Sequence, residues 1–109
     1  MILLTDLLER AGVVPDALHG NCAVGSIEQD SRQVTTGSLF VCMPGHNANS
    51  HDFIPAAKQA GAVGVIAHSR EGLDLAEVHG LSGAMIRHDG SRFNEALCKI
   101  CREYFHNPT

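Results

Sequence analysis

The sequence contains no tryptophan, one tyrosine and four phenylalanines among its 109 residues. Because few large aromatic side chains are available, we expect a core built from Val, Ile, Leu and Ala, within an apolar fraction of 44%. Lys and Arg are also scarce, since eight of them stand against twelve Asp and Glu and give a net charge of −4. This balance lacks the basic footprint of nucleic-acid-binding domains, so no nucleic-acid partner is expected.

Long apolar runs are absent as well. No segment approaches the roughly 20 apolar residues that a helix needs to cross a bilayer. Residues 1–4 are too short for the apolar part of a secretory signal, and the acidic Asp6 and Glu9 follow them closely. We therefore expect a soluble, cytoplasmic protein with no membrane partner. The length suits one compact domain.

Two common nucleotide-binding motifs are missing. The sequence has no GxGxxG, and no Gly precedes Lys58 or Lys99, so the phosphate-binding loop GxxxxGK[ST] is absent. The chain by itself is therefore not expected to hydrolyse ATP by the mechanism of that loop. A phosphate-bearing ligand remains compatible with an acidic chain, because backbone N–H groups can bind phosphate without a net positive charge.

Cysteine and histidine give little indication of a metal or redox site. Cys98 and Cys101 have CxxC spacing, but they lie inside a segment with helical periodicity, and no second CxxC or CxxH completes a zinc site. We interpret them as core-packing residues that stay reduced. Among seven scattered histidines, His46 and His51 are five residues apart, which is not the spacing of a helical zinc pair. No metal site and no catalytic residue is predicted.

Hydrophobic periodicity predicts alternating helices and strands. Residues 39–43 form a continuous apolar run, which is typical of a strand buried on both faces. Residues 19–25 are interpreted as a turn leading into a strand. We expect strands near residues 26–29, 39–43, 63–67 and 84–86, helices near 3–11, 53–60 and 91–106, a weak helix or loop at 71–79, and a turn at 35–37. This order predicts an α/β fold, a small three-layer Rossmann-like domain with a mostly parallel sheet flanked by helices.

The last helix has the clearest pattern. Asp89 or Ser91 is expected to cap its N-terminus. Its inward face is predicted to carry Phe93, Leu97, Ile100, Cys101 and Tyr104, which are spaced to fall on one side of a helix.

Two polar loops follow predicted strands, at residues 30–32 and 45–48. Open α/β sheets bind ligands where strands end and loops diverge. Ser31 offers a hydroxyl and Asn47 an amide, and both groups can donate and accept hydrogen bonds to a base or a phosphate. On the residues alone, a plain turn is the favoured interpretation of each loop, and in it Asp30 bonds local backbone N–H groups.

Three segments carry a resemblance to a known family. They are DSRQVTTGSLFVCMPG at residues 30–45, HDFIPAA at 51–57 and GAV at 61–63. They resemble the DSR-x-V-x-x-G-x-LF-V-x-x-x-G, HDFI-x-x-A and GA-x-x-V segments of the N-terminal domain of Mur ligases. The resemblance runs from about residue 26 to the C-terminus. It implies that residues 1–109 are one uridine-nucleotide-binding domain, a fragment whose ATP-binding and C-terminal domains are absent.

In that family the domain holds the uridine diphosphate end of a UDP-N-acetylmuramoyl-dipeptide. The family's contacts come from the residue before DSR, the Ser of DSR and an H-x-A loop. Carried over, the implied substrate-binding residues are Gln29, Ser31, His46, Asn47 and Ala48. Family members often have Leu or Phe in place of Gln29, whose backbone suffices for a contact, and Asp-Gly in place of Asn49 and Ser50.

The resemblance also implies what the longer enzyme does. ATP and magnesium would act in the full-length enzyme and not in this domain, whose partners are the UDP-linked substrate and the enzyme's own central and C-terminal domains. The segments GHNA at 45–48 and YFHNP at 104–108 favour the E type, which adds the third stem-peptide residue (meso-diaminopimelate or lysine) to UDP-N-acetylmuramoyl-L-Ala-D-Glu. The alternatives are the F type, which adds D-Ala-D-Ala, a stand-alone nucleotide-binding or interaction module, and a thiol redox protein based on Cys98 and Cys101.

Overall fold

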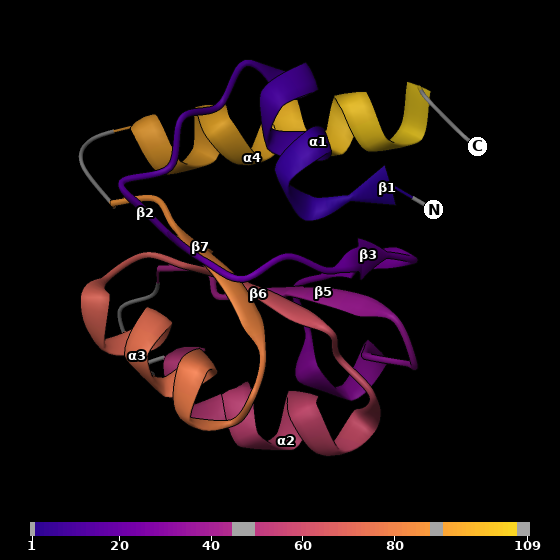
Figure 1. The fold of residues 1–109 in the computed structure, drawn as a ribbon, viewed down its shortest axis with the longest axis vertical. Coiled ribbons are helices and arrows are strands. Elements are labelled where there is room, and N and C mark those ends of the chain that lie inside the picture. The colour runs from indigo at the N-terminus through magenta and orange to yellow at the C-terminus, as the bar shows by residue number, and fades with distance from the viewer. Residues whose placement is uncertain (1, 45–49, 88–90, 107–109) are drawn as a thin grey trace.

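A five-stranded sheet separates two layers of helices in the computed structural model, which describes residues 2–44, 50–87 and 91–106 (Figure 1). The strands are β2 (Ala17–His19), β4 (Ser26–Glu28), β5 (Ser38–Val41), β6 (Gly64–Ala67) and β7 (Ser82–Met85), in the spatial order β2-β7-β6-β5-β4. Strands β4 to β7 run parallel, and β2 joins β7 antiparallel. The predicted α/β fold with a mostly parallel sheet is confirmed.

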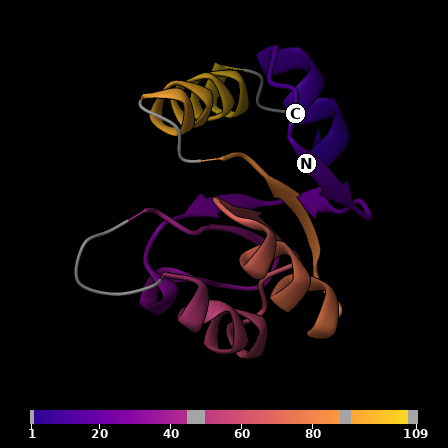
Figure 2. The ribbon, with the colours of Figure 1, turned by 90° about the vertical axis from the view of Figure 1, so that its left-hand side faces the viewer.

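The helices cover both faces of this sheet. Helices α1 (Leu4–Ala11) and α4 (Arg92–His106) lie on one face, and α2 (Ile54–Ala60) and α3 (Arg70–Val78) lie on the other (Figure 2). Two short 3-10 turns, η1 (Ser31–Gln33) and η2 (Ser50–Phe53), follow β4 and precede α2. The three-layer prediction is therefore confirmed, and the segment predicted as a weak helix or loop is the helix α3.

The central strands are buried on both faces, as their apolar runs predicted. In β5, Leu39 and Val41 belong to the core beneath α1 and α4, whereas Phe40 belongs to the core above α2 and α3. Strand β6 divides in the same way, with Ile66 on one side and Val65 on the other. Successive side chains of a strand point to opposite faces, so one continuous apolar run supplies both cores.

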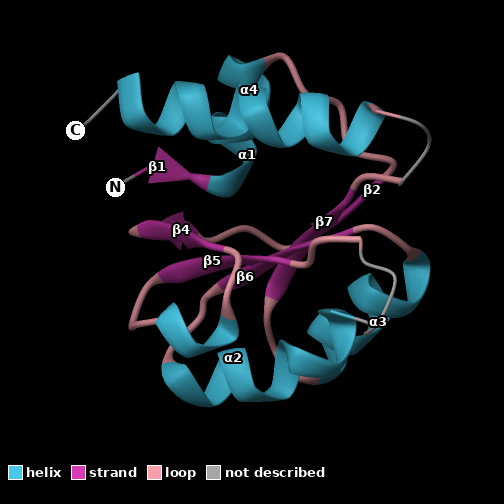
Figure 3. Cartoon of the chain, turned by 180° about the vertical axis from the view of Figure 1, so that it is seen from behind, coloured by secondary structure: helices cyan, strands magenta, loops and turns pink. Residues whose placement is uncertain are grey.

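Three short strands were not predicted. Residues 19–25 contain β3 (Ala23–Val24), which pairs with β1 (Ile2–Leu3) (Figure 1). They also contain the end of the edge strand β2, which lies beside β7 (Figure 3). Strand β2 is held by long-range contacts: the Asp16 carboxylate accepts hydrogen bonds from the backbone N–H of Arg87 (2.9 Å) and from Nη1 of Arg92 (2.9 and 3.0 Å). These bonds, the backbone one first, lower the pKa of Asp16. A strand of three residues is too short to show the alternating pattern from which a strand is predicted.

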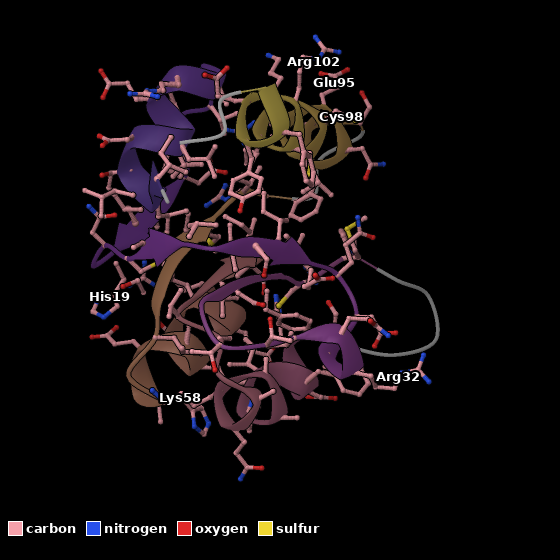
Figure 4. All side chains as sticks on the ribbon, turned by 90° about the vertical axis from the view of Figure 1, so that its right-hand side faces the viewer. His19, Arg32, Lys58, Glu95, Cys98 and Arg102 are labelled. Atoms are coloured by element: carbon pink, nitrogen blue, oxygen red, sulfur yellow. The ribbon has the colours of Figure 1, made fainter. Side chains whose placement is uncertain are left out.

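The inward face predicted for helix α4 is confirmed, but the predicted burial of one of its cysteines is not. Phe93, Leu97 and Ile100 are buried, and Cys101 and Tyr104 pack partly buried against the same core. Cys98 is exposed on the side of α4 that faces away from the sheet (Figure 4), so its interpretation as a core residue is wrong. The reason is the rotation of about 100° per residue in an α-helix, which turns the position after Leu97 away from the inward stripe.

The start of α4 was also predicted. Ser91 directly precedes the helix, and its hydroxyl donates a hydrogen bond to Oε1 of Glu95 (2.9 Å). Asp89, the other expected cap, lies outside the described residues. In the part of the chain that the structure describes, no helix is long and apolar enough to cross a membrane.

Candidate functional site

The parallel neighbours β4 and β5 both end at one edge of the sheet, where the chain continues into loops and turns. Gln29 follows the end of β4, and Met43 lies two residues beyond β5. A cavity of about 480 Å³ lies at this edge between the two strand ends. We call it the β4–β5 cavity, and its lining residues are Gln29, Asp30, Ser31, Arg32, Phe40, Met43, Ser50 and Phe53. The fold thus places Gln29 and Ser31, both predicted site residues, on one concave surface.

The turn η1 shapes one wall of the cavity. Asp30 caps it, because its Oδ1 accepts a hydrogen bond from the backbone N–H of Arg32 (2.9 Å). The Arg32 guanidinium returns to the same carboxylate, with Nη2 2.9 Å from Oδ2. These bonds, the side-chain ones first, hold the pKa of Asp30 below its usual value. The expectation that Asp30 bonds its local backbone is confirmed, and this carboxylate serves the turn.

Ser31 is placed differently from Asp30. The hydrogen bonds of the turn use the carbonyl oxygens of Asp30 and Ser31, which accept from Gln33 and Val34 at 2.9 and 3.4 Å. They do not use the Ser31 hydroxyl. Ser31 is half-buried and lines the cavity, so its binding role stays a prediction that this placement allows.

Apolar side chains complete the cavity. Phe40 comes from β5 and is fully buried, whereas Phe53 comes from the end of η2 and is 45% exposed. Phe53 and Met43 therefore give the cavity apolar surface that can contact a planar ring, and Phe40 backs this wall from the core. Sequence reasoning did not assign a binding role to them. No local pattern gave this signal, because the apolar run that contains Phe40 predicts only burial and the HDFI segment that contains Phe53 was matched without a role for its residues.

The remaining predicted site residues, His46, Asn47 and Ala48, lie outside the described residues, so their role stays a prediction. The residues that flank them are described. The Ser50 hydroxyl donates a hydrogen bond to the Met43 carbonyl oxygen (2.7 Å), and both residues line the β4–β5 cavity. The two ends of this segment are therefore joined at the same cavity as Ser31.

His51 lies directly beside this wall and is 1% exposed. Its ring stacks on the ring of His68, with centroids 4.0 Å apart and planes 24° apart, and its Nε2 accepts a hydrogen bond from the His68 backbone N–H (3.3 Å). Burial first, and the neighbouring His68 second, lower the pKa of His51 to about 4, against a smaller opposing effect of Asp52. His51 is therefore neutral at pH 7. Sequence reasoning rejected it as a metal ligand and placed it in the HDFI segment, without assigning it a role.

A metal centre finds no support in the geometry of the described residues. Within residues 2–44, 50–87 and 91–106, no group of three or more His, Cys, Asp or Glu side chains could hold an ion. The four cysteines are free thiols, and Cys42 is buried, which raises its pKa to about 12. The site therefore offers hydroxyls, backbone groups and apolar surface for binding.

Comparisons with known proteins agree with one another. Residues 23–100 match the family described as "Mur ligase family, catalytic domain". A UDP-N-acetylmuramoyl-L-alanyl-D-glutamate–2,6-diaminopimelate ligase of Bacillus licheniformis is 34% identical over 107 residues, which are 97% of this chain and 20% of that protein. The ligase of the same name from Bacillus cereus is 45% identical over 72 residues, which are 66% of this chain and 14% of that protein.

A plant protein is also among the relatives. A chloroplastic homologue of that ligase from Arabidopsis thaliana is 33% identical over 108 residues, which are 97% of this chain and 13% of that protein. The chain thus spans a fifth or less of the length of these relatives.

Proposed function

Since the chain belongs to the Mur ligase family, we propose that it binds the uridine diphosphate end of a UDP-N-acetylmuramoyl-dipeptide in the β4–β5 cavity. One observation carries the proposal: Gln29 and Ser31 share this cavity with Met43 and Ser50, the residues that flank the segment containing His46, Asn47 and Ala48. Residues distant in sequence that converge at the carboxyl ends of parallel strands are the usual basis of ligand binding in such folds.

The chemistry of the cavity suits a nucleotide. Phe53, which is half-exposed at the cavity, offers aromatic surface against which a uracil ring can pack. The Ser31 hydroxyl can donate to a carbonyl oxygen of the base or to a phosphate, or accept from the base N–H. Arg32 is 86% exposed and paired with Asp30, so the wall carries no net charge from this pair. Polar atoms at the rim and apolar side chains inside are typical of small-molecule sites.

We assign the chain to a ligase that adds the third residue of the peptidoglycan stem peptide, in the cytoplasm. The relatives named as 2,6-diaminopimelate ligases support this choice. In the whole protein, ATP would activate the D-Glu carboxylate as an acyl phosphate, which an amine then attacks. The chain lacks the GxxxxGK[ST] loop, and its described residues offer no cluster for magnesium, so we place both cofactors elsewhere in the protein.

The part of this domain in the reaction would be positioning. Binding energy gained at the remote nucleotide end holds the substrate, and it orients the distant carboxylate for reaction. The domain would thus contribute to the rate without contacting the reacting atoms.

Titration of the isotope-labelled chain with UDP tests the proposal. We expect the amide signals of Gln29, Ser31, Ser50, Phe53 and residues 45–48 to shift first. ADP, which has the same diphosphate and a different base, serves as the control and should shift them less at equal concentration. UDP-induced shifts confined to another surface, such as the cleft lined by Val13, Arg92 and Lys99, would show that the cavity is not the site.

A further inference from the structure

The His51 ring occupies a closely fitted position between two elements. On one side it stacks on His68, the residue that follows β6. On the other side it lies against Gly72 in α3, where an added Cβ would overlap the Cδ2 and Nε2 atoms of the ring. A glycine inside a helix costs about 1 kcal/mol relative to alanine. The fit of the His51 ring gives a physical reason for a glycine at this position.

This fit is directly connected to the β4–β5 cavity. His51 lies within the single turn η2, between Ser50 before it and Phe53 two residues later, and both of these line the cavity. The Ser50 hydroxyl donates to Met43 and also lies 3.5 Å from Nε2 of His68. Because a 3-10 turn is short and tightly wound, fixing His51 fixes its neighbours as well.

His68 connects the fitted ring to the opposite side of the sheet. The His68 ring meets the Phe93 ring edge-on, with centroids 6.3 Å apart, and Phe93 is a buried residue of α4. The stack of Gly72, His51, His68 and Phe93 therefore runs from α3 through the end of β6 to α4. Both helical layers hold the cavity wall in place.

We propose that His51 is a positioning residue for nucleotide binding, whose neutral ring, seated against Gly72 and His68, holds Ser50 and Phe53 in place at the wall of the β4–β5 cavity. The inference rests on the proposed function, because it concerns the same cavity. The acceptor role of Nε2 requires the neutral ring with its proton on Nδ1.

Replacement of His51 tests the acceptor and the fit separately. His51→Leu supplies an apolar side chain of similar size and removes the acceptor. Because Ser50 and Phe53 are then held less firmly, we expect the Kd for UDP to rise about three- to tenfold, which corresponds to at most the free energy of the internal hydrogen bond that is lost. In His51→Gln, the amide oxygen can reach the place of Nε2 and accept from the His68 N–H. This conservative variant should restore most of the affinity. Each Kd is measured where the variant is fully folded, so that lost stability does not lower the apparent affinity.

A double-mutant cycle tests the contact with Gly72. Gly72→Ala should destabilise the protein and weaken UDP binding when His51 is present, because the new methyl group displaces the ring. In a His51→Ala background the ring is gone, so Gly72→Ala should raise the melting temperature and leave the Kd of that background unchanged. The matched control is Gly83→Ala in β7, whose Cβ would lie 2.9 Å from Leu73 Cδ1 in the core beneath α3. It should lower stability without changing the Kd.

The outcomes separate the two proposals. If the unaltered chain does not bind UDP, the proposed function fails and the inference fails with it. If the unaltered chain binds UDP and His51→Leu binds it equally well, the inference alone is wrong. It is also wrong if Gly83→Ala weakens binding as much as Gly72→Ala does, because any core defect would then produce the effect.

Discussion

At the scale of single residues, Ser31 is the side chain from which the most direct effect on binding is expected. Its hydroxyl is not used by the hydrogen bonds of η1, and it lines the β4–β5 cavity. Ser31→Ala should therefore weaken UDP binding about threefold to tenfold, since one hydrogen bond to a neutral group contributes roughly 0.5–1.5 kcal/mol. Folding should barely change. Calorimetric titration with UDP measures the effect.

Ser69→Ala is the matched control for this substitution. Ser69 precedes α3, its side chain makes no capping hydrogen bond, and it is not among the cavity-lining residues. It should bind UDP as the unaltered chain does. Equal affinities of Ser31→Ala and the unaltered chain would remove Ser31 from the site.

The lowered pKa of His51 predicts how the stability of the fold depends on pH. Its pKa is lowered to about 4 from an ordinary value of 6.5, mainly by burial. Between these values the unfolded chain binds the proton and the folded chain does not, so stability falls as the pH falls from about 6.5 to 4. Above about pH 7 the ring is neutral in both states and has no pH-dependent effect. Asp16 and Asp30, whose pKa values are lowered, lose their contribution at more acidic pH.

Urea unfolding at several pH values between 7.5 and 4 measures this dependence. In His51→Gln, which cannot titrate, the decrease in the free energy of unfolding between pH 6.5 and 4 should be smaller than in the unaltered chain. The nearby His68 opposes the charge on His51 and Asp52 favours it, so both are kept unchanged in the comparison. The same pH slope in both proteins would contradict the buried, neutral state of His51.

At the scale of elements, the two cysteines of α4 lie on different faces of the helix. Cys101 packs against the core and Cys98 is exposed, so the sequence-based interpretation of both as core residues holds for Cys101 alone. Cys101→Ala should lower the free energy of unfolding by about 1 kcal/mol, the scale of a small partial cavity. Cys98→Ala should stay within about 0.5 kcal/mol of the unaltered chain, as surface substitutions usually do.

Thiol alkylation checks the same arrangement without mutation. Cys98 should react first in the folded protein. Cys42 should react only on unfolding, because it is buried and its pKa is raised to about 12. Rapid modification of Cys42 in the folded state, or equal stability losses for the two alanine variants of α4, would contradict this arrangement.

At the scale of the whole molecule, the expected activity is binding without turnover. The chain lacks the GxxxxGK[ST] loop, so by itself it should release no phosphate from ATP, with or without a UDP-linked substrate. A phosphate-release assay on the purified chain measures this, and the UDP titration shows that the same preparation is folded and competent to bind. ATP turnover that co-purifies with the chain through successive columns would overturn the expectation.

The sequence alone determined the elements that have strong local patterns. The continuous run at residues 39–43 predicted a strand buried on both faces, because each of its side chains must leave water. The helical spacing of Phe93, Leu97 and Ile100 predicted the inward face of α4 for the same reason. The motif at residues 30–45 predicted the family, and Ser31 and Gln29 as site residues, without reference to their surroundings.

Only the tertiary structure decided which distant residues meet. Strand β2 exists because β7 and the contacts of Asp16 with Arg87 and Arg92 hold three residues that have no strand pattern of their own. The cavity wall formed by Phe53 and the fit of His51 against Gly72 are likewise absent from any local pattern. Hydrophobic periodicity indicates on which face of its own helix or strand a residue lies. The packing of the parallel strands decides which strand ends, turns and rings become neighbours.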